Sequence, residues 1–111
     1  MKITTFLKRG VLVVRVDGEL DMHVADEFRQ CVDHAVSTSG VKHILFNFGT
    51  VNFIDSSGLG VILGRYKKIC ALGGKVLVTN VQPQVVKIFE LSGLLKIITL
   101  YHSEAEALEC L

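Results

Sequence analysis

The chain has 111 residues, half of them hydrophobic, a net charge of +1 at pH 7 and a single proline. This length fits one ordinary domain (residues 1–111), and the apolar fraction is enough for a packed core and too high for a disordered tail. Scattered basic residues and a near-neutral balance argue against a nucleic-acid-binding face, and no apolar run approaches the roughly 20 residues that span a bilayer.

The N-terminal third predicts a β-hairpin followed by a helix. Two β-rich runs, Ile3–Leu7 and Val11–Val16, are separated by a short turn with a glycine. Apolar residues then recur at three- and four-residue steps from Val24 to Val36, as in an amphipathic helix. Asp21 precedes this helix, where its side chain either caps the first turn or lies exposed.

The rest of the chain alternates strands with helices. The expected elements, in chain order, are a buried strand within Val41–Phe48, a helix from Ser56 to about Leu72, a strand over Lys75–Val81, a helix opened by Pro83, a last strand over Ile97–Leu100 and a short helix capped by Ser103 and Glu106. Helical crossovers favour parallel strands. We therefore expect an α/β fold with a mixed, mostly parallel sheet of about five strands flanked by about four helices.

The most informative segment is Asp55-Ser56-Ser57-Gly58-Leu59-Gly60, where a strand runs into a helix. Aspartate and serine here are explained most simply as N-caps. Three such residues followed by two glycines exceed what a cap requires, and glycines at positions 58 and 60 would let another macromolecule approach the backbone. A phosphate on Ser56 would be tolerated at a helix start and would change the surface that a partner meets.

The helix that follows adds a possible docking surface. At 100° per residue, one arc faces the sheet, a thin side face consists of small residues and Lys67, and a third side should point to solvent. We place Val61, Arg65, Lys68 and Leu72 on that solvent side, next to the small-residue face and the serine-rich helix start.

Enzyme chemistry is poorly supported. The nucleophile-elbow pattern is absent, no histidine has a signature that places it near Ser56 or Ser57, and the glycine spacing does not match a dinucleotide loop. The three cysteines lack paired spacing, and no residues have the spacing of metal ligands. We expect no metal, no cofactor, free thiols and, without a signal peptide, a cytoplasmic protein.

These motifs resemble the STAS domain. Gly18-Glu19-Leu20-Asp21, followed by Phe53-Ile54 and the Asp-Ser-Ser-Gly-Leu-Gly segment, is similar to the family, and Val61–Ile69 looks like the anti-sigma factor antagonists of sporulation.

The resemblance implies partner switching. The unphosphorylated protein would bind an anti-sigma factor that is also a serine kinase, and so free a sporulation sigma factor. The kinase would inactivate it at Ser56, and a serine phosphatase would restore it. Contacts to the partner are implied at these positions: Asp21, Asp55, Ser56, Ser57, Gly58, Gly60, Val61 and Arg65. Ser57 has the same chemistry as Ser56 and is the alternative phosphorylation site. The alternative function is another regulatory STAS module, such as one in a stress response. The lack of a membrane span disfavours a STAS domain at the tail of an anion transporter.

Overall fold

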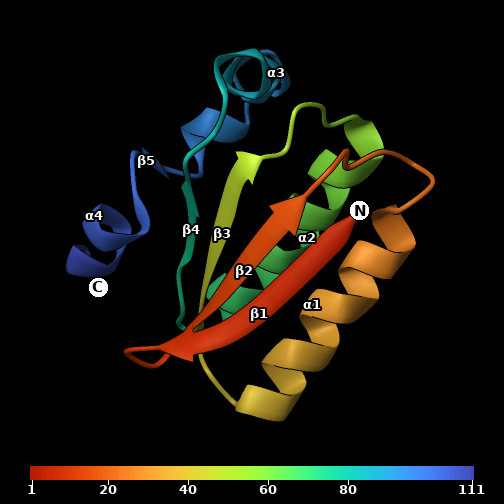
Figure 1. Cartoon of the computed structure of the whole chain (residues 1–111). Coiled ribbons are helices and arrows are strands. Elements are labelled where there is room, and N and C mark those ends of the chain that lie inside the picture. Colours follow the sequence, from red (N-terminus) through yellow and green to blue (C-terminus); the bar gives the residue numbers. More distant parts are fainter.

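A computed structural model describes residues 1–111 as one five-stranded sheet with helices on both of its faces (Figure 1). The sheet order is β1-β2-β3-β4-β5, which follows the chain order. The elements are β1 (Lys2–Lys8), β2 (Val11–Asp17), α1 (Ala25–Ser39), β3 (His43–Thr50), α2 (Ser56–Ala71), β4 (Val76–Thr79), α3 (Pro83–Ser92), a 3₁₀ turn (Leu94–Lys96), β5 (Leu100–Tyr101) and α4 (Glu104–Glu109).

The predicted hairpin and mixed sheet are confirmed. β1 and β2 are antiparallel, and every later pair of neighbouring strands is parallel. The hairpin turn has Arg9 and Gly10 at positive φ (53° and 75°), the two left-handed positions of a type I′ turn. This turn matches the twist of the two strands, so the hairpin register is fixed locally.

The sheet separates two cores because alternate residues of each strand point to opposite faces. On one face, strand residues such as Phe46 and Phe48 pack against α1, α2 and α3 in a cluster of 20 buried residues. On the other, a smaller cluster is covered by α4 and consists of Val11, Val13, Leu45, Leu77, Ala107 and Leu108. The second core covers only part of that face of the sheet, so polar strand residues beside it are not covered by a helix.

Helix ends follow the sequence signals with one exception. Gly40 and Gly93 close α1 and α3 in the left-handed conformation, and Ser103 caps α4 by accepting the Glu106 N–H. The residue that caps α1 is Val24, without a side-chain hydrogen bond. Asp21 lies before the helix, where its main-chain oxygen accepts the N–H groups of Val24 and Ala25.

The expected last strand exists, but its predicted bounds, Ile97–Leu100, were wrong. Residues Leu94–Lys96 form a 3₁₀ turn, and β5 begins only at Leu100. The N–H groups of Ile97 and Ile98 donate back to the Leu94 oxygen, at 3.1 and 3.0 Å, so they are not free for a strand ladder. Ile98 is nevertheless buried, because the turn directs its side chain into the main core.

None of the helices combines the length and the apolar character needed to cross a membrane.

Candidate functional site

The first turn of α2 is capped by Asp55, which follows the end of β3. Asp55 has an extended backbone, and its Oδ1 accepts the N–H groups of Ser57 at 2.9 Å and Gly58 at 3.1 Å. Two of the helix's unpartnered donors are thereby satisfied. The N-capping explanation given for this aspartate therefore holds, and the two serines remain available for other roles.

The second oxygen of Asp55 holds a distant loop. Its Oδ2 accepts the Met22 N–H at 2.9 Å, which joins the segment before α1 to the start of α2. Beside it, Leu20 and Ile54 form an isolated parallel bridge, with Leu20 N–H donating to Phe53 and Asp55 N–H donating to Leu20. The two segments that the sequence singled out are thus neighbours, and Asp21 lies next to the helix that begins at Ser56.

The two glycines of the motif, Gly58 and Gly60, differ in what a side chain at each position would meet. A Cβ on Gly58 would lie 2.4 Å from the Leu20 main-chain oxygen and 2.8 Å from Ile54 Cγ1, so only glycine allows the loop to approach. Gly60 is exposed and a Cβ there would meet nothing within 4 Å. Gly58 is therefore needed for internal packing, and only Gly60 leaves backbone open to a partner.

The two serines differ in exposure. Ser56 is the first helical residue and is exposed, whereas Ser57 is partly buried. No hydrogen bond is made by either hydroxyl, to a histidine or to any other group. Ser56 therefore presents a free hydroxyl to solvent at the positive end of a 16-residue helix.

Two large apolar side chains flank this site, and the sequence reasoning missed both. Met22 is 70% exposed and Phe53 is 43% exposed. Each belongs to a segment tied to the start of α2, Met22 through Asp55 and Phe53 through Leu20. The available signal was a large hydrophobic residue within a polar loop, which alone does not separate an exposed side chain from a buried one.

The solvent side assigned to α2 was wrong for Val61 and Arg65, whereas Lys68 and Leu72 are exposed as predicted. Val61 is 8% exposed and belongs to the main core, and the Arg65 side chain is 12% exposed, with its Nε 3.2 Å from Asp33 Oδ1 on α1. Val61 shares the buried side of the helix with Gly58, Ile62 and Ile69, and Arg65 faces α1 through Asp33. The outward face is the one of small residues and Lys67, which begins at Ser56 and continues through Gly60.

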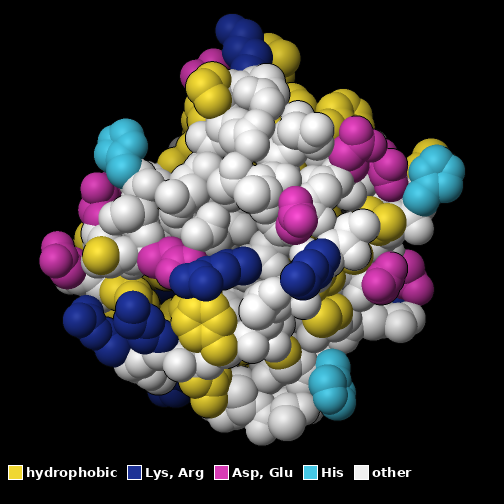
Figure 2. Space-filling model, viewed as in Figure 1, with side chains coloured by type: hydrophobic (Ala, Val, Ile, Leu, Met, Phe, Trp, Pro, Cys, Tyr) yellow, Lys and Arg dark blue, Asp and Glu magenta, His cyan; other side chains and the backbone are white.

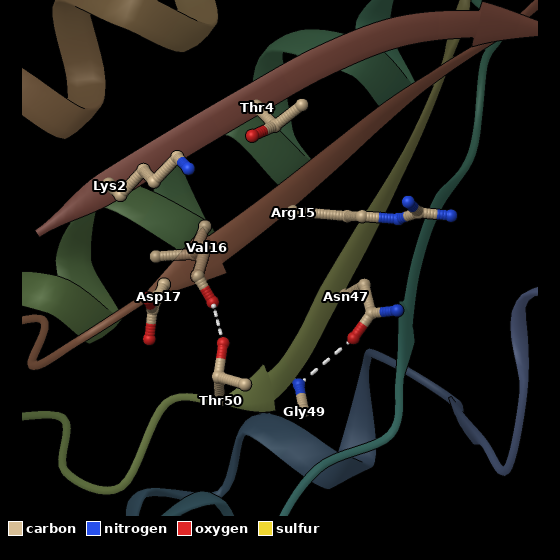
Figure 3. Close-up of a pocket in the computed structure, with 8 residues that line it drawn as sticks. All are labelled: Lys2, Thr4, Arg15, Val16, Asp17, Asn47, Gly49 and Thr50. Carbon is tan, nitrogen blue, oxygen red and sulfur yellow. Dashed lines mark hydrogen bonds between the residues drawn. The ribbon is translucent and has the colours of Figure 1, made fainter.

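A second polar region lies on the opposite face of the sheet, beside α4. It is a shallow hollow of about 290 Å³, lined by Lys2, Thr4, Arg15, Val16, Asp17, Asn47, Gly49 and Thr50 (Figure 3). Several of these groups already have partners: Thr50 Oγ1 donates to the Val16 oxygen at 3.0 Å and Asn47 Oδ1 accepts the Gly49 N–H at 2.9 Å. Internal bonding of this kind indicates a structural surface.

The same region holds α4 in place. The Arg15 guanidinium donates two hydrogen bonds to the Glu104 carboxylate, both at 2.9 Å, and Asn47 Nδ2 donates a third at 2.7 Å. The hydrogen bonds from Arg15 outweigh burial and lower the pKa of Glu104 from its ordinary value. Figure 2 shows acidic and basic side chains interspersed on this face, without a broad basic area.

Groups for metal binding are not gathered anywhere in the structure: no three His, Cys, Asp or Glu side chains lie close enough to share an ion. All three cysteines are free in this structure. His43 has a structural contact, because its Nδ1 accepts the Lys75 N–H at 3.0 Å.

Comparison with known proteins assigns the family. The model of the STAS domain matches residues 2–107. The anti-sigma F factor antagonist of Paenibacillus polymyxa is 47% identical over 100 residues, which cover 90% of this chain and 86% of that protein.

Solved structures of related proteins have the same fold as this chain. An anti-sigma factor antagonist from Mycobacterium paratuberculosis superimposes with a TM-score of 0.88 at 28% identity, covering 98% of this chain and 92% of that one. The Bacillus cell fate determinant SpoIIAA in its phosphorylated form gives 0.74 at 32% identity, with 97% of each chain covered. The chain therefore belongs to the STAS domain family, and two of the relatives described above are anti-sigma factor antagonists.

Proposed function

We propose that this protein is an anti-sigma factor antagonist controlled by phosphorylation of Ser56. Unphosphorylated, it binds an anti-sigma factor that is also a serine kinase and thereby releases a sporulation sigma factor. The kinase inactivates it at Ser56 and a serine phosphatase restores it. The observation that carries this proposal is the exposed, unbonded hydroxyl of Ser56 on the first residue of a capped helix.

The helix start accounts for tolerance of the phosphate. A phosphoserine adds about 1.5 to 2 negative charges at neutral pH. The positive end of α2 favours an anion at this place, and no contact inside the chain has to break, because the Ser56 hydroxyl makes no hydrogen bond. The fold of the modified protein is thus expected to be the same.

The surface around Ser56 accounts for loss of the partner. Contacts are proposed to centre on Ser56 and Gly60, with the exposed side chains of Met22 and Phe53 at the margin. A dianion buried there without a matching cation would lose its hydration, which costs several kcal/mol. A penalty of that size lowers affinity by roughly two to three powers of ten. Binding is switched off without a large change of shape.

Ser56 is preferred over Ser57 on physical grounds as well as by family resemblance. A kinase must seat the hydroxyl in its own active site, and only the Ser56 side chain is exposed. The main-chain N–H of Ser57 is also held by Asp55 at 2.9 Å. Neither serine hydroxyl is hydrogen-bonded to a base, which supports a regulatory protein over an enzyme with a serine nucleophile. The proposed partners place its action in the cytoplasm.

The test uses a cognate anti-sigma factor kinase of sporulation and ATP. Intact mass and peptide fragmentation should find one phosphate, on Ser56, in the unmodified chain and in Ser57→Ala, and none in Ser56→Ala. Calorimetry should show that Ser56→Ala binds the kinase and that the phosphorylated chain binds about a hundredfold more weakly or worse. A phosphate on another residue, or equal binding by the two forms, contradicts the proposal. Modification only by a stress-response kinase would favour the alternative STAS module.

A further inference from the structure

A cavity of about 260 Å³ lies between α1 and α2, at the end of α2 remote from Ser56. Half of its lining is aliphatic: Val36 from α1, Ile69 from α2, Leu72 directly after α2, and Ile44 of β3. The other lining residues are polar or charged: Asp33, Ser37, Arg65 and Lys68. Ile44 and Ile69 belong to the main core, so the floor of the cavity is the core itself. Arg65, the lining residue of α2 nearest to Ser56, lies nine residues after it, which is about 14 Å along the helix.

Charges in the cavity are unbalanced. Arg65 Nε lies 3.2 Å and Lys68 Nζ 4.0 Å from the same oxygen, Asp33 Oδ1. Two cations therefore share one carboxylate, and one positive charge in the lining has no counterion. Lys68 is mostly exposed, but Arg65 is not.

The Arg65 guanidinium is also short of acceptors. Its Nη1 is buried and makes no hydrogen bond, and its Nε is paired with Asp33 at 3.2 Å but not in hydrogen-bond geometry. Buried donors without acceptors are rare in folded proteins and cost about 1–3 kcal/mol each, more on a charged group. The guanidinium therefore keeps a donor that no group of this chain accepts, beside four aliphatic side chains.

We propose that this cavity binds a small amphipathic anion, with a single hydrocarbon chain on the apolar walls and a carboxylate head at Arg65 and Lys68. A planar carboxylate matches the fork of a guanidinium. An inorganic anion would leave the aliphatic walls empty. The volume is just below the range of about 300–1,000 Å³ typical of ligand pockets, which favours one short chain over a two-chain lipid or a nucleotide.

The experiment compares octanoate with 1-octanol, which has the same chain length and no charge, on the full chain followed by amide chemical shifts. Octanoate should give saturable shifts confined to the second halves of α1 and α2, and octanol should bind at least about tenfold more weakly. Equal binding of the two, shifts that do not saturate, or shifts located elsewhere would overturn the proposal and identify an adventitious additive only.

Two matched variants distinguish binding at this cavity from a general effect of the protein's positive charge. Arg65→Met removes the cation while keeping much of the hydrocarbon stem, and should weaken octanoate binding by about tenfold with octanol unchanged. Lys67→Met makes the same change of charge on the outward face of α2 and should leave octanoate affinity within about twofold. Equal effects of the two variants contradict the proposal. If Arg65→Met does not fold, the octanoate and octanol comparison on the unmodified chain decides alone.

Discussion

Asp55 Oδ2 accepts the main-chain N–H of Met22 at 2.9 Å, across 33 positions of sequence. The same carboxylate caps α2 through its other oxygen. One side chain thus determines both where the helix begins and which loop lies beside it. This relationship explains how the two segments that carry the family motif come to form one surface.

Replacing Asp55 should destabilise the fold as well as the site. Asp55→Ala removes an N-cap, at about 0.5–2 kcal/mol, and the bond to Met22, at about 0.5–1.5 kcal/mol. We expect a loss of about 1–3.5 kcal/mol in the free energy of unfolding, measured by urea denaturation. Asp55→Asn keeps one acceptor for the cap and should lose less. Equal losses for the two variants would show that the cap contributes little.

Replacing each glycine by alanine should distinguish a role in internal packing from a role in contact with the partner. In Gly58→Ala the new methyl group meets the Leu20 oxygen and Ile54, and overpacking of this kind costs about 1–3 kcal/mol. Gly60→Ala has open space and gains helix propensity, so its stability should rise by up to about 1 kcal/mol. Thermal unfolding checks both. Under the proposed function, Gly60→Ala should nevertheless weaken binding to the anti-sigma factor; unchanged binding would place the contact elsewhere.

Acid should weaken the attachment of α4. The pKa of Glu104 is lowered in the folded protein, mainly by its hydrogen bonds with Arg15, from an ordinary value of 4.5. A lowered pKa gives stability that is present above that ordinary value and is lost as the pH falls through it toward the folded value. The stability difference between the unmodified chain and Glu104→Gln should therefore shrink below pH 4.5. A difference that stays constant from neutral pH downward would contradict this assignment.

The three thiols should differ in reactivity. Burial, helped by the Glu27 carboxylate, raises the pKa of Cys31, so less of its reactive thiolate is present at neutral pH. Cys70 and Cys110 are exposed. A thiol-specific maleimide followed by mass mapping should label Cys70 and Cys110 before Cys31. Labelling of Cys31 first would show that the α1 face around it opens readily.

Local signals predicted most of the fold. The hairpin, the strand–helix alternation and the caps depend on residues close in sequence, such as Gly10 in the turn and Ser103 before α4. The error near the C-terminus had a local cause of a different kind: Ile97 and Ile98 are as apolar as strand residues, yet their N–H groups close a turn on Leu94. Hydrophobicity alone does not distinguish these two arrangements.

The orientation of α2 could not be predicted because it depends on a partner from another helix. Arg65 counts as polar in any pattern, and only the nearby Asp33 of α1 explains its burial. Gly58 counts as small and neutral, yet it is the closest approach of the helix to the Leu20 loop. Asp55 and the two serines were recognised from the capping pattern, whereas the link to Met22 joins positions that no local signal connects.

The unbonded hydroxyl of Ser56 has a consequence for the turnover of the protein in the cell. Proteases act on the fraction of a chain that is transiently unfolded, and this fraction depends on the free energy of unfolding. Under the proposed function, a phosphate at the start of α2 breaks no hydrogen bond of the Ser56 hydroxyl, and it should change that free energy by only about 1 kcal/mol. Both forms should then be degraded at similar rates, so the signal would be carried by the ratio of the two forms, with the total amount of protein left unchanged.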